Sequence, residues 1–299
     1  MDNTLIYDIG MHNGDDTAFY LACGFRVIAV EADPDLVALA NKRFKTEIDS
    51  KKLVILNVGI AEHTAQAAFW INEEDSTKNS FNRELTARYG HPHHSILINC
   101  RRLDEILSEY GVPFYLKIDI ENNDIVCCNQ LTPATKPKFI SVEMSQMELL
   151  IRLRNLGYDR FKLILQFDLS PVEPQDTKLR MASKWVHKAT DYPMDDRKLL
   201  LRIRRAVARK LLNMARAVRA KLGRTPQPFK SRMLPEWNFA EGASGSFGED
   251  LPGKWLSYEE AAYLWHRELT DYQKRGREYW CDLHATTSTE NPNFTTTCS

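Results

Sequence analysis

Short apolar runs alternate with amphipathic segments from residue 5 to about residue 168. The apolar runs predict strands at 5–9, 25–30, 53–57, 67–71, 114–120, 139–144 and 162–167. Segments of helical period between them predict helices at 16–23, 35–44, 103–110 and 147–156. Apolar strands that alternate with helices are typical of a parallel sheet covered by helices on both faces. The pattern therefore predicts an α/β fold whose ligand site lies at the carboxyl ends of the strands.

The composition changes after residue 167, which predicts a different organisation for the rest of the chain. A connecting stretch rich in Pro, Asp and Lys comes first, and residues 237–255 are rich in Gly, Ser and Trp. Ser257 and Glu260 have the spacing of a capping box and predict a helix over 257–278. Residues 286–299 are polar and rich in Thr, which is typical of a disordered tail. We therefore divide the chain into 1–169, 170–236, 237–285 and 286–299.

The formal net charge of zero, from 40 Lys+Arg and 40 Asp+Glu residues, hides a strongly basic segment. Residues 197–224 hold eleven Lys or Arg and no Asp or Glu, which leaves 29 basic against 40 acidic residues elsewhere. Apolar positions recur there at steps of three and four and predict a basic amphipathic helix. Such a helix covers an apolar face of its own domain, lies on an anionic membrane surface or follows nucleic-acid phosphates. The segment lacks aromatic residues for base stacking, which disfavours nucleic acid as its partner.

Several features bear on where the protein works. The mean hydropathy is −0.43, and no apolar run approaches the ~20 residues of a membrane span. The chain start shows no signal-peptide pattern, and the six cysteines follow no CxxC spacing. These features predict a cytoplasmic protein with reduced thiols, which becomes peripheral on the inner membrane face if the basic helix binds lipid.

The segment 7–17 leads from an apolar strand through a glycine turn, which lets a ligand approach the backbone, into a helix. Glu31 ends the next predicted strand, twenty-one residues after Gly10, at the spacing of an acid that binds both hydroxyls of a ribose. G-x-G-x-x-G is absent, and the acidic residues of the turn would repel a pyrophosphate. S-adenosylmethionine carries no phosphate and has two cationic groups, so the turn suits this ligand better than a dinucleotide.

A second polar group lies on the strand predicted at 114–120. Lys117, Asp119 and Glu121 alternate along the chain and therefore lie on one side of it. Glu143 ends the next candidate strand, which predicts a cluster of carboxylates at the carboxyl edge of the sheet. Strands otherwise avoid unpaired acids, so the cluster indicates a functional role.

Four motifs occur in order along the first half of the chain. They are Asp8-Ile9-Gly10 with Gly14 and Thr17, Val30-Glu31-Ala32-Asp33-Pro34, Arg102-Leu103-Asp104, and Leu116-Lys117-Ile118-Asp119-Ile120-Glu121. Together they resemble the FkbM family of S-adenosylmethionine-dependent O-methyltransferases, over about residues 5–167. The resemblance implies a class I methyltransferase fold, which is Rossmann-like, and methyl transfer to hydroxyls of sugars or secondary metabolites. The family usually has a glycine after the glutamate, whereas this chain has Asn122-Asn123. Met11-His12 also replaces smaller residues, and this second difference should narrow the cofactor entrance.

The resemblance and the spacing together define a candidate site. The cofactor residues are expected to be Asp8, Gly10, His12, Asn13, Gly14, Thr17, Glu31, Ala32, Asp33 and Gly59. Asp119 is the first choice for the base that removes the hydroxyl proton, with Glu121 or Glu143 raising its proton affinity, while Lys117 stabilises the alkoxide or neutralises the cluster. A divalent cation held by Asp119, Glu121 and Glu143 is a second route to the same end. The sequence leaves both routes open.

Residues 237–285 are expected to form the acceptor side. The stretch 243–250, flanked by Trp237 and Trp255, suits a carbohydrate acceptor, or it is a structural loop held by the tryptophans. His91-Pro92-His93-His94 is either an ordinary loop or a metal site. The expected acceptor is a hydroxyl on a glycan or glycolipid. A small secondary metabolite is one alternative, and a catalytically silent glycan-binding module on the same fold is another.

Overall fold

The computed structural model describes residues 2–121, 123–173, 229–240, 242–273 and 280–288, and the structural statements below concern these residues. The basic segment 197–224 and residues 289–299 of the polar tail lie outside the described residues. The roles considered for the basic segment and the disorder expected for the tail therefore stay predictions. Among the described helices, none has the length and apolar composition to cross a membrane.

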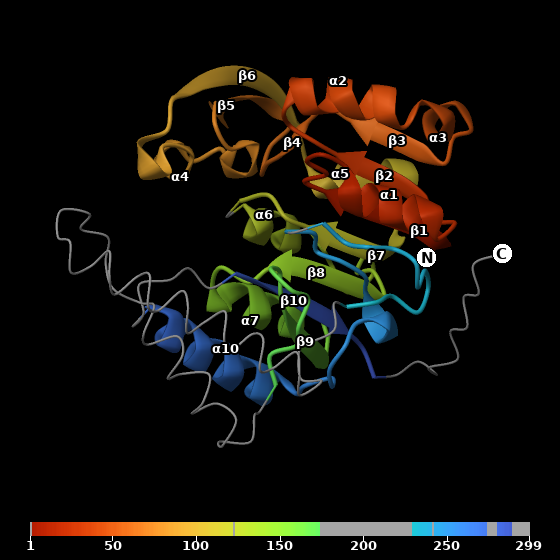
Figure 1. Cartoon of the computed structure of the whole chain (residues 1–299), viewed down its shortest axis with the longest axis vertical. Coiled ribbons are helices and arrows are strands. Elements are labelled where there is room, and N and C mark those ends of the chain that lie inside the picture. Colours follow the sequence, from red (N-terminus) through yellow and green to blue (C-terminus); the bar gives the residue numbers. More distant parts are fainter. Residues whose placement is uncertain (1, 122, 174–228, 241, 274–279, 289–299) are drawn as a thin grey trace, which may run out of the picture.

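A seven-stranded sheet forms the centre of the molecule, in the order β3–β2–β1–β7–β8–β10–β9 (Figure 1). Neighbouring strands are parallel except where β10 pairs with β8 and β9. The strands are β1 (Asp2–Ile9), β2 (Arg26–Val30), β3 (Leu53–Leu56), β7 (Pro113–Ile118), β8 (Phe139–Glu143), β9 (Arg160–Leu165) and β10 (Cys281–Thr286). The mostly parallel α/β sheet expected from the apolar pattern is confirmed.

Helices cover both faces of this sheet because its strands carry apolar side chains on both sides. On one face α5, α6, α7 and α10 pack on a cluster that includes Tyr7 and Leu116. On the other face α1 and α2 pack with Phe247 on a cluster that includes Ile6 and Tyr115. The helices are α1 (Asp15–Ala22), α2 (Pro34–Arg43), α3 (Lys45–Asp49), α5 (Leu103–Tyr110), α6 (Asp124–Asn129), α7 (Met147–Asn155) and α10 (Tyr258–Gln273).

The expected capping box starts α10. The backbone N–H of Ser257 donates to Glu260 Oε2 at 2.8 Å, and the N–H of Glu260 donates to Ser257 Oγ at 3.2 Å. These two bonds satisfy donors that the first turn of a helix leaves without partners. The helix is described as far as Gln273, and the remaining residues expected in it, 274–279, lie outside the described part.

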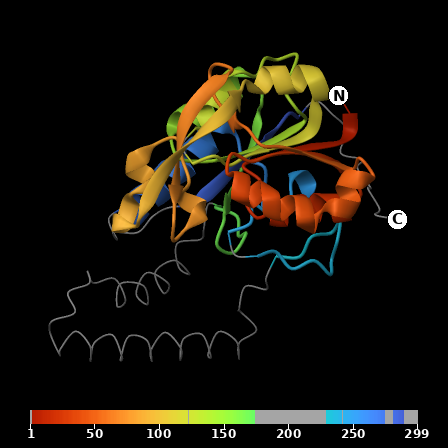
Figure 2. The same cartoon turned by 90° about the horizontal axis from the view of Figure 1, so that it is seen from above.

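A second sheet of three strands stands to one side of the first, in the order β4–β6–β5 (Figures 1 and 2). Its strands are β4 (Gly59–Ile60), β5 (Ala65–Asn72) and β6 (His93–Arg101), and β5 and β6 pair as antiparallel neighbours. The connection between them carries η1 (Ser76–Lys78), α4 (Arg83–Thr86) and η2 (Arg88–Gly90). The strand expected at 67–71 is the central part of β5. β6 has no predicted counterpart, because its first residues are the histidines that we interpreted as a loop or a metal site.

The strand β10 was not predicted either. It inserts between β8 and β9 (Figure 1). It is antiparallel to both, with Asp282 opposite Glu143. Its alternate residues Asp282, His284 and Thr286 are polar but buried, so no apolar run marks the strand in the sequence. Residues 237–285, which we expected on the acceptor side, therefore also complete the central sheet.

Candidate active site

The turn between β1 and α1 forms the floor of the candidate site. Gly10 has φ 82°, and a Cβ built on it would lie 1.9 Å from the backbone oxygen of Asp119, which follows β7. Gly14 has φ 80°, and its Cβ would lie 2.6 Å from the ring of Phe44. These glycines therefore allow segments of the protein to approach one another, in addition to any access that they give to a ligand.

A cavity of about 520 Å³ opens at the carboxyl ends of β1, β2 and β7. Cavities of this size hold small-molecule ligands and cofactors. Four of the predicted cofactor residues, Asp8, Gly14, Thr17 and Asp33, do not line it. Asp8, Gly14 and Asp33 form hydrogen bonds with residues that do, and Thr17 donates to Asp8. The predicted residues that line the cavity are Gly10, His12, Asn13, Glu31, Ala32, Gly59, Lys117, Asp119 and Glu121.

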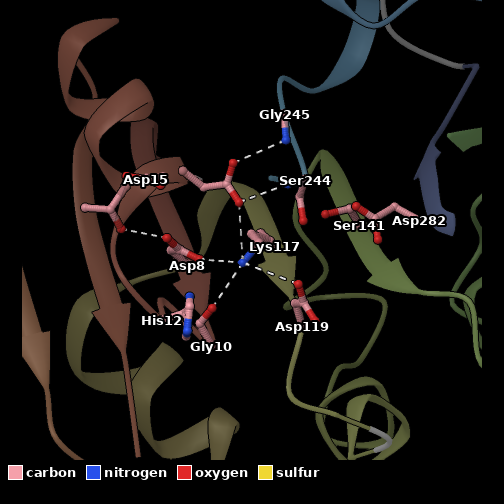
Figure 3. A network of polar contacts seen from close by, with 12 residues as sticks. Asp8, Gly10, His12, Asp15, Lys117, Asp119, Ser141, Ser244, Gly245 and Asp282 are labelled. Carbon is pink, nitrogen blue, oxygen red and sulfur yellow. Dashed lines mark hydrogen bonds and ion pairs between the residues drawn. The ribbon is translucent and has the colours of Figure 1, made fainter. Parts of the chain in front are cut away.

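Lys117 is the centre of a buried polar network beside the cavity (Figure 3). Its Nζ donates to Asp8 Oδ1 and to the backbone oxygen of Gly10, both at 3.1 Å, and lies 3.9 Å from Asp119 Oδ2. Asp8 is fully buried, and its other carboxylate oxygen accepts a hydrogen bond from Thr17 Oγ1 at 2.6 Å. Burial by itself would lower the pKa of Lys117, but Asp8 and Asp119 hold that pKa well above its ordinary value. Of the two roles considered for Lys117, these contacts favour neutralisation of the acids.

Asp16 belongs to the same network, although the sequence singled it out only as one acid of the turn. Its carboxylate accepts hydrogen bonds from the backbone N–H groups of Ser244 at 3.1 Å and Gly245 at 3.2 Å (Figure 3). It also lies 3.7 Å from Lys117 Nζ. Burial raises the pKa of Asp16 to about 6, and the charge of Lys117 opposes that rise. Asp16 thus fastens the C-terminal part of the chain to the first turn of α1.

Glu31 lines the cavity directly after β2. Its Oε2 accepts a hydrogen bond from the N–H of His12 at 2.7 Å, and its Oε1 accepts one from the N–H of Asp33 at 2.9 Å. Burial raises the pKa of Glu31 to about 7, although the two backbone donors oppose the rise. Each carboxyl oxygen keeps a second lone pair, so the group can still accept hydrogen bonds from hydroxyls of a ligand.

The connection between β5 and β6 closes one side of the cavity, which the sequence did not indicate. Ser76 Oγ lies 2.8 Å from Nε2 of His12, and Asn79 Nδ2 donates to Asp33 Oδ2 at 2.9 Å. Burial and the charge of Lys117 lower the pKa of His12, so its ring is neutral at pH 7. A neutral ring held by a serine supports the turn and the cavity wall, which agrees with a binding role for His12.

Glu121 lines the cavity with a left-handed backbone, at φ 48°. Asn123 has φ −99°, so the glutamate and not this asparagine takes the conformation that a glycine adopts easily. Glu121 Oε1 lies 3.4 Å from Lys78 Nζ, which also lies 5.1 Å from the ring centre of Trp280. Burial raises the pKa of Glu121, and the charge of Lys78 opposes the rise. A strained, half-buried acid at this position fits a functional turn.

The aromatic residues at the cavity differ from the two that the sequence indicated. Trp237 packs against Phe19 with ring centres 5.7 Å apart, and Trp255 donates a hydrogen bond to Glu249 in η3 (Gly248–Asp250). Neither of these tryptophans lines the cavity, whereas Phe167 and Trp280 do. Phe167 is 50% exposed, which is unusual for a phenylalanine of a folded chain.

The two metal sites considered are not supported by the positions of their residues. His94 Nδ1 lies 3.0 Å from Glu73 Oε1, and His91 Nε2 lies 3.5 Å from Glu74 Oε2, so these histidines have carboxylate partners of their own. In the part of the chain that the structure describes, no three His, Cys, Asp or Glu residues form a group that could hold a metal ion. This includes the trio expected to hold a divalent cation.

Comparison with known proteins defines the class. Residues 8–160, about half of the chain, match the family model described as the methyltransferase FkbM domain. The chain belongs to this family of methyltransferases, as its motifs indicated. The seven-stranded, mostly parallel sheet with helices on both faces is the class I methyltransferase fold.

Three solved structures are similar to this chain at low TM-scores. An FkbM methyltransferase from Methylobacillus flagellatus has 17% identity and a TM-score of 0.36 over 52% of this chain and 38% of its own. A precorrin-6y C5,15-methyltransferase from Geobacter metallireducens has 12% identity and a TM-score of 0.31 over 57% of this chain and 73% of its own. Phosphoethanolamine N-methyltransferase 2 from Haemonchus contortus, solved with S-adenosyl-L-methionine, has 9% identity and a TM-score of 0.34 over 95% of this chain and 49% of its own. No curated protein matches in sequence. The chain spans less than half the length of the first and third structures.

Proposed function

We propose that this methyltransferase binds S-adenosylmethionine in the cavity and transfers its methyl group to a hydroxyl of a glycan or glycolipid. The observation that carries the proposal is the position of Glu31, whose carboxyl group lines the cavity at the end of β2, beside the glycine turn that follows β1. A carboxylate at this position accepts hydrogen bonds from the two hydroxyls of a ribose.

The remaining lining fits the rest of the cofactor. Ile60, Phe69 and Phe81 give apolar surface on the side of the second sheet, where an adenine base would be covered. Asp15, Asp16 and Asp119 line the cavity elsewhere and favour the cationic part of S-adenosylmethionine, while they would repel the phosphates of a dinucleotide. When bound, S-adenosylmethionine supplies a methyl group on a good leaving group.

The chain itself must then orient the acceptor and accept a proton. Asp119 lines the cavity, and a quarter of its side-chain surface is exposed, at 26%, so an acceptor hydroxyl can reach it. The Lys117 ammonium lies 3.9 Å from the Asp119 carboxylate and fixes its position. We assign Asp119 as the general base. Lys117 acts through this ion pair, and Glu121 borders the acceptor beside Lys78.

Phe167 and Trp280 support a ring-shaped acceptor at the same end of the cavity. The apolar faces of a sugar ring pack on aromatic side chains, while its hydroxyls meet the neighbouring carboxylates. A hydroxylated secondary metabolite would use the same base and is distinguished by the acceptor screen below.

The experiment is calorimetry followed by an acceptor screen. We expect the purified protein to bind S-adenosylmethionine and not NAD, and to transfer labelled methyl groups from this cofactor to glycans. Binding of NAD, or of neither ligand, would contradict the cofactor assignment. Cofactor binding with transfer only to small metabolites would replace the glycan acceptor, and glycan binding without cofactor binding would indicate the catalytically silent module.

A further inference from the structure

A row of polar side chains crosses the central sheet on the face covered by α1. Asp8, Lys117, Ser141, His284 and Lys162 are direct neighbours on five successive strands, from β1 to β9. All five side chains are buried. Buried sheet positions are usually apolar, so this row is a polar band within a face that is otherwise packed with apolar side chains.

A second row lies two residues closer to the carboxyl ends of β7 and β8, and it consists of acids. Asp119 and Glu143 follow directly on paired residues of β7 and β8, and Glu143 is the direct partner of Asp282 on β10. Side chains of direct neighbours in a sheet lie about 5 Å apart, and like charges there repel. We call Asp119, Glu143 and Asp282 the carboxyl row. It begins at the cavity, which Asp119 lines, and continues away from it to Asp282 on β10.

The carboxyl row has too few cations to be fully ionised. Lys117 pairs most closely with Asp8, and Lys78 pairs with Glu121. Glu143 and Asp282 form no ion pair with any residue in the described ranges. Asp282 is 2% exposed, and its Oδ2 has no hydrogen-bond partner among the described residues, although Oδ1 accepts a bond of 2.6 Å from Gln166 Nε2.

Glu143 and Asp282 therefore favour their protonated forms. Burial, and then the charge of Asp119, raises the pKa of Asp282 to about 8, against the opposing effects of Gln166, Lys117 and Ser244. Burial and the charges of Asp119, Glu121, Asp124 and Asp282 raise the pKa of Glu143 well above its ordinary value. Asp124, on α6, is a further buried acid near the row, and neither of its carboxylate oxygens has a hydrogen-bond partner among the described residues.

We infer that the carboxyl row releases a proton when the sulfonium of S-adenosylmethionine enters the cavity, and that it thereby distinguishes this methyl donor from its demethylated product. The inference rests on the proposed function, because it needs this cofactor in the cavity. S-adenosylmethionine and S-adenosylhomocysteine differ by one methyl group and one positive charge. Comparing the two therefore shows how the row responds to nearly the same ligand with and without a cation. A cation beside buried acids stabilises their ionised form, and the displaced proton leaves to solvent.

Calorimetry of both ligands tests the inference without any acceptor. Each ligand is titrated into the whole protein at pH 7 in phosphate and in Tris, whose different heats of ionisation reveal the protons exchanged. We expect S-adenosylmethionine to release about one proton more than S-adenosylhomocysteine. The affinity for S-adenosylmethionine should then rise relative to that for S-adenosylhomocysteine by up to about tenfold per pH unit between pH 6 and pH 8.

Two variants assign the effect to the row. Asp282→Asn keeps an oxygen to accept the bond from Gln166 and should remove much of the difference in proton release, and Glu143→Gln should do the same. Glu259→Gln, which removes an exposed carboxylate on α10, is the matched control and should leave the difference unchanged.

The outcomes separate cleanly. Equal proton release by the two ligands in the unmodified protein overturns the inference and leaves the proposed function intact. A difference that persists in both row variants overturns the assignment to these residues. Failure to bind S-adenosylmethionine at all overturns the proposed function and the inference with it.

Discussion

The backbone oxygen of Asp119 lies in the space that a side chain on Gly10 would need, 1.9 Å from the ideal Cβ position. The same approach is supported by the Asp119 N–H, which donates to the backbone oxygen of Ile9 at 2.9 Å. The ends of β1 and β7 are therefore joined at the floor of the cavity. Asp119, which we assign as the base, is held in position by β1, the strand that leads into the cofactor turn.

Gly10→Ala should therefore destabilise the protein by about 2–5 kcal/mol, because the collision adds to the strain of a left-handed backbone. Gly24→Ala is the matched control, since Gly24 has φ 88° but no neighbour within 4 Å of its ideal Cβ, and it should cost only about 1–2 kcal/mol. Urea denaturation of the three proteins measures both effects. Equal losses in the two variants would mean that the collision is relieved by movement of the strand end.

The local pattern of apolar and polar positions predicted the fold. It also indicated those residues of the site that lie at or near the end of an individual strand. Glu31, Lys117 and Asp119 each end an apolar run or interrupt one, and each lines the cavity. Asp16 could not be assigned, because its partners Ser244 and Gly245 come from the far end of the chain. Sequence periodicity indicates which positions are buried by apolar packing. It does not indicate polar groups that are buried against partners far away in the sequence.

The same limit explains the unpredicted strands. β10 alternates buried apolar with buried polar residues, so it lacks the continuous apolar run by which the other strands of the main sheet were predicted. β6 carries exposed polar residues because it lies in a small second sheet. The β5–β6 connection, which supplies Ser76 and Asn79 to the cavity, has no periodic pattern that could place it there.

Glu31→Gln should weaken S-adenosylmethionine binding by about 2 kcal/mol, because the amide loses one of the charge-assisted acceptors for the ribose hydroxyls. The amide oxygen still accepts one backbone N–H, so the turn should keep its shape. Calorimetry gives the affinity, and circular dichroism checks the fold. A folded variant with unchanged affinity would remove Glu31 from the cofactor site.

Asp119→Asn should leave the affinity for S-adenosylmethionine nearly unchanged while methyl transfer falls by on the order of a hundredfold, because an amide cannot accept the hydroxyl proton. The paired measurement is cofactor binding by calorimetry and turnover with a labelled methyl group. Near-normal turnover in a variant that binds the cofactor would assign the base to another group.

Trp280→Ala should raise the KM for the acceptor roughly tenfold with little change in cofactor affinity, because it removes an aromatic face from the acceptor end of the cavity. Trp237→Phe is the control, since Trp237 packs against Phe19 away from the cavity lining. Steady-state kinetics with each substrate varied in turn separates the two effects. A larger rise in the acceptor KM for Trp237→Phe than for Trp280→Ala would indicate that the acceptor binds beside Trp237.

Asp124→Asn should make the stability less dependent on pH. The pKa of the buried Asp124 is raised well above 3.8 in the folded protein, so its contribution to stability is complete below about pH 4 and is lost as the pH rises toward the raised value. We expect the variant to gain more than about 1 kcal/mol relative to the native protein between pH 5 and pH 8, measured by urea denaturation. Asp49→Asn, at an exposed site, should follow the native curve, and parallel curves for all three proteins would show that Asp124 does not titrate in this way.

The insertion of β10 between β8 and β9 has a consequence for how the protein is made. β9 ends at Leu165 and β10 begins at Cys281, so a ribosome releases residues 166–280 before the strand that joins β8 to β9 exists. During that time β8 exposes an unpaired edge, and β9 has no partner within the main sheet. The nascent chain therefore passes through a state with an open edge, and the sheet that contains the region shared with the family model is completed only after Thr286 has been made.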